Sequence, residues 1–469
     1  MKFDSAVEKY RDVIVEHIQS LVRIRSVEET PEEGMPFGRG PYEALDYMLS
    51  IGAELGFSVK NYDGYAGHIE YGESCRAGDG YIGVLIHVDV VPEGEGWTIP
   101  PYEARIVDGK IYGRGAYDDK GACVAVLYAL KALKDSGYLP RKRIRIIVGA
   151  NEETGMKGIP YYLNREPEPE FAFSPDAPFP VIYGEKGILD LSFELDTGTD
   201  HQGMVIAVTG GKSSKYVPAE CTARLNLDSD QLNAAIKALG QLEDQFRSNY
   251  SFDDTRNELT VTIFGTEAYG TEPHKGKNAI AGMMRFLGQI DSGKDPLSVF
   301  IREFNRTIGV QTDGSGLGCD FTDDISTPLT FNVGSIEYAG GELVMKVHIR
   351  YPITSSYEEV TNAIQSTFQV PGIRITTDRH SASHLVDRDS FLVKTLMQIY
   401  RDAAGEPDAE PITMTGGTYA RTLVNAVAFG PLFPSEEQVA HSPDEYLNIN
   451  SIIKAAKIYA EAMFILSQQ

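Results

Sequence analysis

The sequence is poor in cysteine and tryptophan, with four cysteines and one tryptophan among 469 residues. Cys75, Cys123, Cys221 and Cys319 lie far apart, and none belongs to a CxxC pair. So few and scattered cysteines exclude a disulfide scaffold. They favour small buried residues in a reducing compartment over a zinc site built on cysteine.

Positive charge is also scarce. The chain has 43 lysines and arginines against 67 aspartates and glutamates, so its formal net charge is −24. Nucleic-acid binding requires clustered cations that contact phosphates, and anionic membranes attract basic segments. We therefore expect neither nucleic acid nor a membrane as a partner.

Long apolar runs are missing as well. No stretch of about 18 uncharged apolar residues is present, so no membrane span is predicted. The first residues, MKFDSAVEKYRD, lack the apolar core of a signal peptide. We expect a cytoplasmic protein.

Several common enzyme motifs are absent. The sequence has no HExxH, and the glycines of DGSGLG (313–318) have the wrong spacing for a nucleophile elbow. The segment GGKSS (210–214) lacks the first glycine of a P-loop, and GRGAYDDKG (113–121) does not match a dinucleotide fingerprint. These absences disfavour a zincin, a serine hydrolase, a P-loop protein and a Rossmann dehydrogenase.

The N-terminal part has the pattern of an α/β domain. Residues 80–91 form a nearly continuous apolar run, residues 121–137 predict a buried helix that stops at Gly137, and residues 144–150 form another apolar run. A strand, a helix and a strand in this order predict a βαβ unit. Helices are also expected at 5–25 and 42–56.

The middle of the chain has an α+β pattern. Its expected strands are 188–196, 204–210, 221–227, 259–265, 343–354 and 372–378, and its expected helices are 229–248, 278–290 and 355–368. Strong helical patterns and an apolar run (424–433) return after residue 390. We therefore expect a discontinuous α/β domain (1–185 and 385–469), with helices on both faces of a mixed sheet, and an inserted α+β domain (186–384).

Carboxylates and histidines follow the predicted strands of the α/β domain: His87 and Asp89, Asp118, Glu152 and Glu153, Asp176, and His441. Each has an ordinary structural explanation, such as a buried histidine, a helix N-cap or a solvated loop. Taken together, they cluster at the carboxyl ends of the predicted strands, where open α/β sheets have their ligand-binding sites. Histidine and carboxylate ligands without thiolates suit Zn²⁺, Mn²⁺ or Co²⁺.

These motifs resemble the zinc-dependent metallopeptidase family twenty, which includes carboxypeptidase G, acetylornithine deacetylase and carnosinases. The resemblance runs in order along nearly the whole chain, through HVDVVP, GRGAYDDKG, NEETG, SPDA and His441. The segments IRYPIT (349–354), GGTYAR (416–421) and AFGPLFPSEE (428–437) look most like the PepV-type dipeptidases. The resemblance to this family implies a catalytic domain with an inserted lid domain.

The resemblance also implies the ligands of two metal ions. His87 and Asp176 would bind one ion, and Glu153 and His441 the other. Asp118 would bridge them, often with a cis peptide bond after it. The ions would be Zn²⁺, with Mn²⁺ or Co²⁺ as alternatives.

In such a site, Glu152 would be the general base for a water shared by the two metal ions, and Asp89 would orient His87. Arg350 resembles the residue that binds the terminal carboxylate of the substrate, for which a guanidinium is suited. Backbone N–H groups at Gly416, Gly417 and Thr418 would line the carboxylate pocket.

Two positions in the inserted domain depart from the family pattern. Tyr269 stands where relatives have a histidine that stabilises the oxyanion, and His274 follows five residues later. The hydroxyl of Tyr269 could donate a hydrogen bond to the oxyanion in place of that histidine. Alternatively, His274 could supply the donor from a shifted loop, or the donor could be lost. Lys215 and Tyr216 replace a usual Asn and apolar residue, so Lys215 either selects an acidic substrate group or points to solvent.

We therefore predict a dipeptidase that requires a free C-terminal carboxylate. The alternatives are a deacylase of N-acyl amino acids, a degenerate homologue with weak turnover, and a structural module. The inserted domain resembles a lid that mimics a partner subunit, so we expect a monomer, with a dimer as the alternative.

Overall fold

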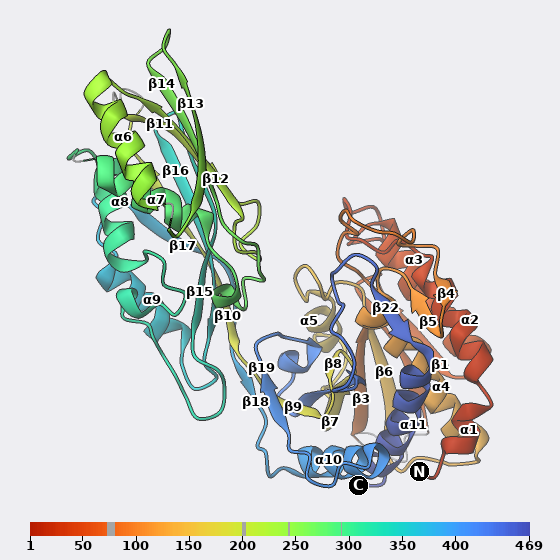
Figure 1. Cartoon of the computed structure of the whole chain (residues 1–469). Coiled ribbons are helices and arrows are strands. Elements are labelled where there is room, and N and C mark those ends of the chain that lie inside the picture. Colours follow the sequence, from red (N-terminus) through yellow and green to blue (C-terminus); the bar gives the residue numbers. More distant parts are fainter. Residues whose placement is uncertain (73–79, 199–202, 243, 292) are drawn as a thin grey trace. The chain divides into compact units, whose positions relative to one another are not determined.

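A computed structural model describes residues 1–72, 80–198, 203–242, 244–291 and 293–469. The chain forms two compact units. The first unit comprises Met1–Gly184, Leu385–Thr413 and Gly417–Gln469, and the second comprises Glu185–His384 and Met414–Gly416. The second unit is therefore inserted into the first (Figure 1).

The first unit is built on a nine-stranded mixed sheet with the strand order β1-β2-β6-β3-β7-β20-β9-β18, in which β19 also pairs with β9. Strands β6, β3, β7 and β20 run parallel, whereas β2 and β9 pair antiparallel with their neighbours β6 and β20. The strands are β1 (Ser58–Tyr62), β2 (Ala66–Tyr71), β3 (Tyr81–His87), β6 (Arg143–Gly149), β7 (Phe171–Ser174), β9 (Val181–Glu185), β18 (His384–Leu385), β19 (Ile412–Met414) and β20 (Ala426–Phe429).

Helices cover both faces of this sheet, as the sequence predicted. Alternate residues of a strand point to opposite faces. Val84 and Ile86 belong to the large core, whereas Leu85 belongs to a smaller core on the other face. The large core is packed by α1 (Asp4–Glu8), α2 (Arg11–Val22), α3 (Arg39–Glu54), α4 (Gly121–Asp135), α10 (Phe391–Ala404) and α11 (Ile449–Leu466). The smaller core is packed by α5 (Gly158–Leu163) and the 3₁₀ helix η4 (Tyr419–Thr422).

The predicted βαβ unit is confirmed. Strand β3 pairs in parallel with β6, and α4 lies between them in the chain. Twelve of the 15 residues of α4 are buried, which explains its nearly uniform apolar sequence. The helix stops before Gly137, whose φ of +72° favours glycine.

Short elements complete the first unit. They are the two-stranded sheet of β8 (Ala177–Pro178) and β21 (Pro431–Leu432), the three-stranded sheet of β4 (Arg105–Val107), β5 (Lys110–Tyr112) and β22 (Tyr446–Asn448), and the π-type turn η1 (Ala116–Lys120). The sheet of β22, β5 and β4 joins a C-terminal segment to the region before η1.

The second unit contains an eight-stranded antiparallel sheet with the order β13-β14-β12-β11-β15-β16-β10-β17. The strands are β10 (Gly187–Asp196), β11 (Val205–Gly210), β12 (Glu220–Asn226), β13 (Arg247–Asp253), β14 (Glu258–Phe264), β15 (Thr330–Ala339), β16 (Glu342–Tyr351) and β17 (Arg374–Ser381). Its helices are α6 (Ser229–Leu242), α7 (Ala279–Ile290), α8 (Pro296–Thr307) and α9 (Tyr357–Thr367), with short 3₁₀ turns η2 (Pro273–Lys275) and η3 (Ser315–Leu317).

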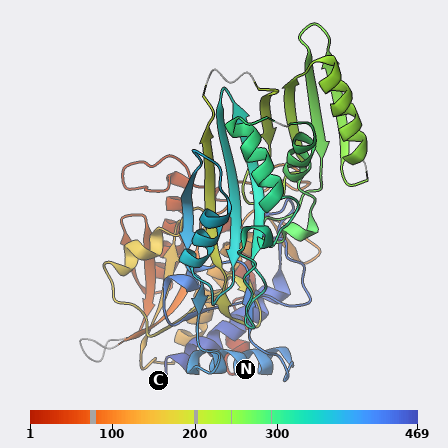
Figure 2. The same ribbon diagram turned by 90° about the vertical axis from the view of Figure 1, so that its left-hand side faces the viewer.

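The helices of the second unit lie on one side of its sheet (Figures 1 and 2). Leu189, Leu191 and Phe193 alternate along β10 and share a core with residues of α6–α9. One apolar face and one more polar face are typical of antiparallel sheets. The predicted α+β character of the insertion is confirmed.

Several predicted elements were wrong in their bounds or were missed. The helix predicted at 5–25 is two helices, α1 and α2. The helix predicted at 229–248 stops at Leu242, and β13 starts at Arg247. Strand β13 is an edge strand with no buried residue, so its sequence lacks apolar alternation. Helix α8 was missed although Asp295 caps it and a proline follows.

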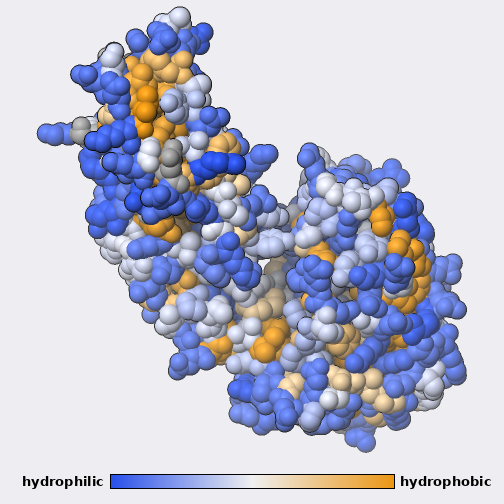
Figure 3. Space-filling model, viewed as in Figure 1, coloured by the Kyte–Doolittle hydropathy of each residue, from blue (hydrophilic) through white to orange (hydrophobic). Residues whose placement is uncertain are grey.

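Hydrophilic residues cover most of the surface seen in Figure 3. Among the described residues, none of the helices is long and apolar enough to cross a membrane. Cys123, Cys221 and Cys319 are free and buried, as the sequence predicted, and Cys75 lies outside the described residues.

Candidate metal centre

Three neighbouring parallel strands bring polar residues to one edge of the sheet in the first unit. His87 is the last residue of β3, Glu152 and Glu153 follow β6, and Asp176 follows β7. Because β3 pairs in parallel with both β6 and β7, these positions meet at the carboxyl ends of the strands. Open α/β sheets place their sites at this edge.

Two further residues come from loops. Asp118 lies in η1, just before α4, and the peptide bond between Asp118 and Asp119 is cis, as the resemblance implied. His441 lies in the loop between β21 and β22 and has a φ of +62°, which residues other than glycine rarely adopt. Residues about 350 positions apart in the chain therefore meet at one site.

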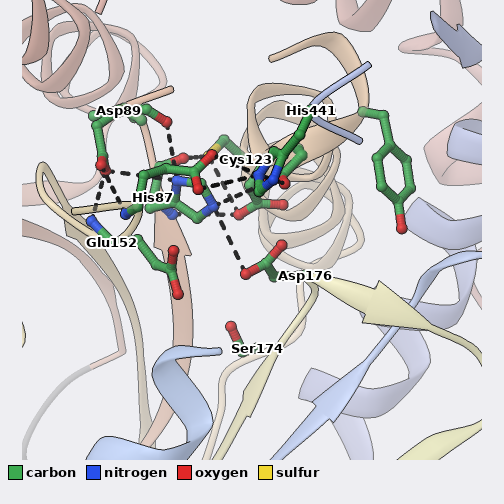
Figure 4. Close-up of polar contacts among 12 residues, drawn as sticks. His87, Asp89, Cys123, Glu152, Ser174, Asp176 and His441 are labelled. Carbon is green, nitrogen blue, oxygen red and sulfur yellow. Dashed lines mark hydrogen bonds and ion pairs between the residues drawn. The ribbon is translucent and has the colours of Figure 1, made fainter. Parts of the chain in front are cut away.

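The first group of potential ligands surrounds His87, whose side chain is buried. Its Nε2 atom lies 3.0 Å from Oδ1 of Asp118 and 3.7 Å from Oδ2 of Asp176. Figure 4 shows the carboxylate of Asp176 directed toward His87. His87, Glu152 and Asp176 each offer one ligand atom within 4.8 Å of the others.

The second group consists of Asp118, Glu153 and His441, whose ligand atoms also lie within 4.8 Å of one another. Nε2 of His441 lies 3.1 Å from Oδ2 of Asp118 and 3.1 Å from Oε2 of Glu153. The two oxygens of Asp118 therefore face two different histidines. This carboxylate links the two groups.

The buried side chains of the centre affect one another's pKa values. Burial raises the pKa of Asp176 to about 7, and the nearby Asp118 carboxylate adds to the rise. Burial also raises the pKa of Glu152 well above its ordinary value. Burial alone would lower the pKa of His87, but its hydrogen bonds with Asp118, Asp176 and Asp89 raise it. Clustered buried carboxylates of this kind require cations to remain ionised together.

The residues present fit divalent metal ions. Oε1 of Glu152 is buried and has no hydrogen-bond partner among the described residues, which is costly for a carboxylate that points into a polar site. The donors are imidazole nitrogens and carboxylate oxygens, which suit Zn²⁺, Mn²⁺ and Co²⁺. Cys123 donates to the main-chain oxygen of His87 and belongs to neither of the two groups of potential ligands among the described residues.

Asp89 contacts both His87 and the loop of the two glutamates. Nδ1 of His87 lies 3.6 Å from the carboxylate of Asp89 and 3.0 Å from its main-chain oxygen, which is compatible with the predicted role of Asp89 in orienting His87. The carboxylate also accepts from the main-chain N–H groups of Glu152 (2.9 Å) and Glu153 (3.0 Å). Asp89 therefore fixes the loop that carries both glutamates.

Glu445 is a further residue of the centre that sequence reasoning missed. Its side chain is fully buried and accepts from the main-chain N–H groups of Tyr117 (3.0 Å) and Asp118 (3.2 Å). It also pairs with Arg114 at 2.5 Å. It ties the loop of His441 to that of Asp118. Its only signal in the sequence is its position four residues after His441.

The remaining predicted site residues are distributed over both units. Tyr269, His274, Arg350 and Gly416 belong to the second unit, whereas Gly417 and Thr418 belong to the first. Arg350 lies on β16, and His274 is exposed in η2. Thr418 is buried, and its side chain caps η4 by accepting from the N–H of Ala420.

The two departures from the family pattern lie side by side in the second unit. Tyr216 and Tyr269 form an isolated β-bridge, and their ring centroids are 5.8 Å apart. Both rings are partly exposed, at 39% and 46%. Asn332 on β15 holds this segment, because its side-chain amide donates to the main-chain oxygens of Ser214 and Tyr216. Lys215, between Ser214 and Tyr216 in the chain, is exposed.

Comparison with known proteins gives consistent matches. The model of Peptidase family M20/M25/M40 matches residues 83–464. "Putative dipeptidase YtjP" of Bacillus subtilis is 37% identical over 485 aligned positions, which cover 100% of both chains. A "Putative dipeptidase" of Staphylococcus epidermidis is 33% identical, with 98% of each chain covered.

Solved structures with the same fold include human carnosine dipeptidase 1, with a TM-score of 0.61 and 15% identity over 100% of this chain and 98% of the other. The dipeptidase Dug1p of Saccharomyces cerevisiae has a TM-score of 0.60 and 14% identity, with 99% and 98% covered. At these identities the similarity shows the fold alone.

Proposed function

Because the chain belongs to peptidase family M20/M25/M40, we propose that it is a dipeptidase that uses two divalent metal ions and requires a free C-terminal carboxylate on its substrate. Two relatives named "Putative dipeptidase" match over 98% or more of their length. The observation that carries the proposal is the pair of ligand groups joined by Asp118, with the unpartnered carboxylate of Glu152 beside them.

In this proposal, His87 and Asp176 would hold one ion, Glu153 and His441 would hold the other, and Asp118 would contribute to both. Zn²⁺ fits this donor set, with Mn²⁺ and Co²⁺ as alternatives. When bound, a pair of such ions polarises the scissile carbonyl group and lowers the pKa of a shared water.

Glu152 moves the proton. Its carboxylate takes a proton from the attacking water and then gives it to the nitrogen of the leaving amine, as general acid–base catalysis requires. Burial raises the pKa of Glu152, which suits a group that must both accept and release a proton near neutral pH. Asp89 keeps Glu152 in place, because its carboxylate accepts a hydrogen bond from the main-chain N–H of Glu152.

Substrate recognition in the proposal depends on Arg350 and on a few main-chain N–H groups. Arg350 pairs with the terminal carboxylate, because a guanidinium presents two parallel N–H donors to it. The main-chain N–H groups at Gly416, Gly417 and Thr418 complete the carboxylate pocket. Tyr269 donates to the oxyanion in place of the usual histidine, with His274 as the alternative donor, and Lys215 influences the choice of side chain.

A substrate panel tests this function. We expect the metal-loaded protein to release both amino acids from Ala-Leu, and to cleave Ala-Leu amide with a kcat/KM about 10–100-fold lower, because the amide loses the charged partner of Arg350. The measurement is amino-acid release with Zn²⁺, Mn²⁺, Co²⁺ or chelator. Cleavage of N-acetyl-leucine but not of Ala-Leu would instead identify a deacylase. No cleavage with two bound metals would identify a degenerate homologue.

A further inference from the structure

A row of polar residues crosses the second unit on the face of the sheet away from its helices. Asn332 on β15, His348 on β16, Asp190 on β10 and Arg379 on β17 lie opposite one another in register. Their sequence neighbours Phe331, Ile349 and Leu189 point the other way, into the core shared with the helices. The imidazole of His348 is 4% exposed and the carboxylate of Asp190 is 17% exposed.

Arg350 is attached to this row through His348. The two residues are separated by one position on β16, so their side chains share a face. Nε of Arg350 donates to Nε2 of His348 at 2.9 Å, and Nδ1 of His348 lies 2.5 Å from Oδ1 of Asp190. Nη1 of Arg350 donates to the main-chain oxygen of Thr415 at 3.1 Å. The guanidinium is thereby held at two of its nitrogens.

The contacts require one form of the His348 ring. A nitrogen that accepts from Arg350 carries no proton, so the ring is neutral and its proton lies on Nδ1, where it is donated to Asp190. Burial lowers the pKa of His348 despite its hydrogen bond with Asp190, and Arg350 and Arg379 lower it further. Burial would raise the pKa of Asp190, but its hydrogen bond with His348 and the charges of Arg379 and Arg350 together lower this pKa, so the carboxylate is ionised.

We infer that His348, held by Asp190, is a positioning residue that fixes the guanidinium of Arg350 in the orientation that binds the C-terminal carboxylate of the substrate. The inference rests on the proposed role of Arg350. An arginine side chain loses considerable rotamer freedom when it binds a ligand. Holding it beforehand lowers that cost, which is the general advantage of a preorganised site.

The experiment compares His348→Ala and Asp190→Asn with the wild type on Ala-Leu and on Ala-Leu amide. We expect KM for Ala-Leu to rise about tenfold in each variant, with kcat nearly unchanged and little effect on the amide. His348→Gln places an amide oxygen near the position of Nε2 and should restore most of the lost affinity. His380→Ala is the matched control, because this histidine lies on β17 and its Nε2 lies 2.8 Å from the hydroxyl oxygen of Tyr351.

Two results would overturn the inference. One is an equal rise of KM for the dipeptide and its amide, which would indicate general damage to the second unit. The other is that His348→Ala raises KM for Ala-Leu as much in an Arg350→Met background as in the wild type. If His348 acts through Arg350, the effects of the two substitutions are not additive.

A measurement without turnover separates the inference from the proposed function. In ¹⁵N-histidine NMR spectra, with the His348 signal assigned by its loss in His348→Ala, we expect a protonated Nδ1 and an unprotonated Nε2 that shifts in Arg350→Met. A protonated Nε2 would overturn the inference even in an active enzyme. The expected spectrum in a protein that cleaves no dipeptide would support the contact and contradict the dipeptidase function.

Discussion

Replacing Glu152 by glutamine is expected to lower kcat for dipeptide cleavage by about 10²–10⁴-fold, which is the usual contribution of a general base. The amide is nearly the same size as the carboxylate but cannot take a proton from water. Asp89 holds residue 152 through the main chain, so the loop should keep its position. The measurement is single-substrate kinetics on Ala-Leu, together with the metal content of the purified variant.

The metal content makes this prediction specific. Glu152→Gln should retain two metal ions per chain, because His87, Asp176, Glu153, His441 and Asp118 remain. Glu168→Gln is the matched control, since Glu168 is exposed in the proline-rich segment before β7 and should leave kcat unchanged. A variant that keeps a tenth or more of the wild-type kcat would exclude Glu152 as the general base. Loss of one metal ion would make Glu152 a ligand instead.

Removing the metal ions is expected to abolish turnover and to leave the fold in place. The proposed ligands lie at strand ends and in loops, whereas the large core of the first unit is built from apolar residues of the sheet and helices. Ligand binding stabilises a fold by about 2.7 kcal/mol at a hundredfold excess over Kd. Metal removal should therefore lower Tm by several degrees without unfolding the protein at 25 °C.

Circular dichroism and activity, both recorded after treatment with 1,10-phenanthroline, test this prediction. Protein treated with phenanthroline that was first saturated with Zn²⁺ is the control for inhibition by the chelator itself. Unfolding at room temperature would contradict the account, because it would make the metal ions structural. Full activity after complete metal removal would contradict the proposed mechanism.

The sequence was sufficient to predict those elements of the fold that are buried on both sides. The apolar runs of β3 and β6 and the uniformly apolar α4 allow one interpretation, a βαβ unit, and this was confirmed. Edge strand β13 was missed because all of its residues are at least partly exposed, and exposed strands carry no periodic signal. The helix predicted at 229–248 overlaps only its first two residues. Strand β15 was missed although it lies in the middle of its sheet.

The parallel order of the strands also explains why the proposed ligands lie close together. His87, Glu153 and Asp176 follow three adjacent parallel strands, so their meeting at one edge could be expected. The roles of Glu445 and His348 could not be predicted in this way. Glu445 acts on main-chain N–H groups of a loop far away in the chain, and the contact of His348 depends on strand register. Neither property is visible in a single sequence.

The central claim is that the residues around Asp118 bind two metal ions that are both required for dipeptide cleavage. The most direct measurement is a titration of the metal-free protein with Zn²⁺, in which bound metal and Ala-Leu turnover are followed together. The account predicts that turnover reaches its maximum at two bound ions per chain. Full turnover at one bound ion, or none at two, would contradict it.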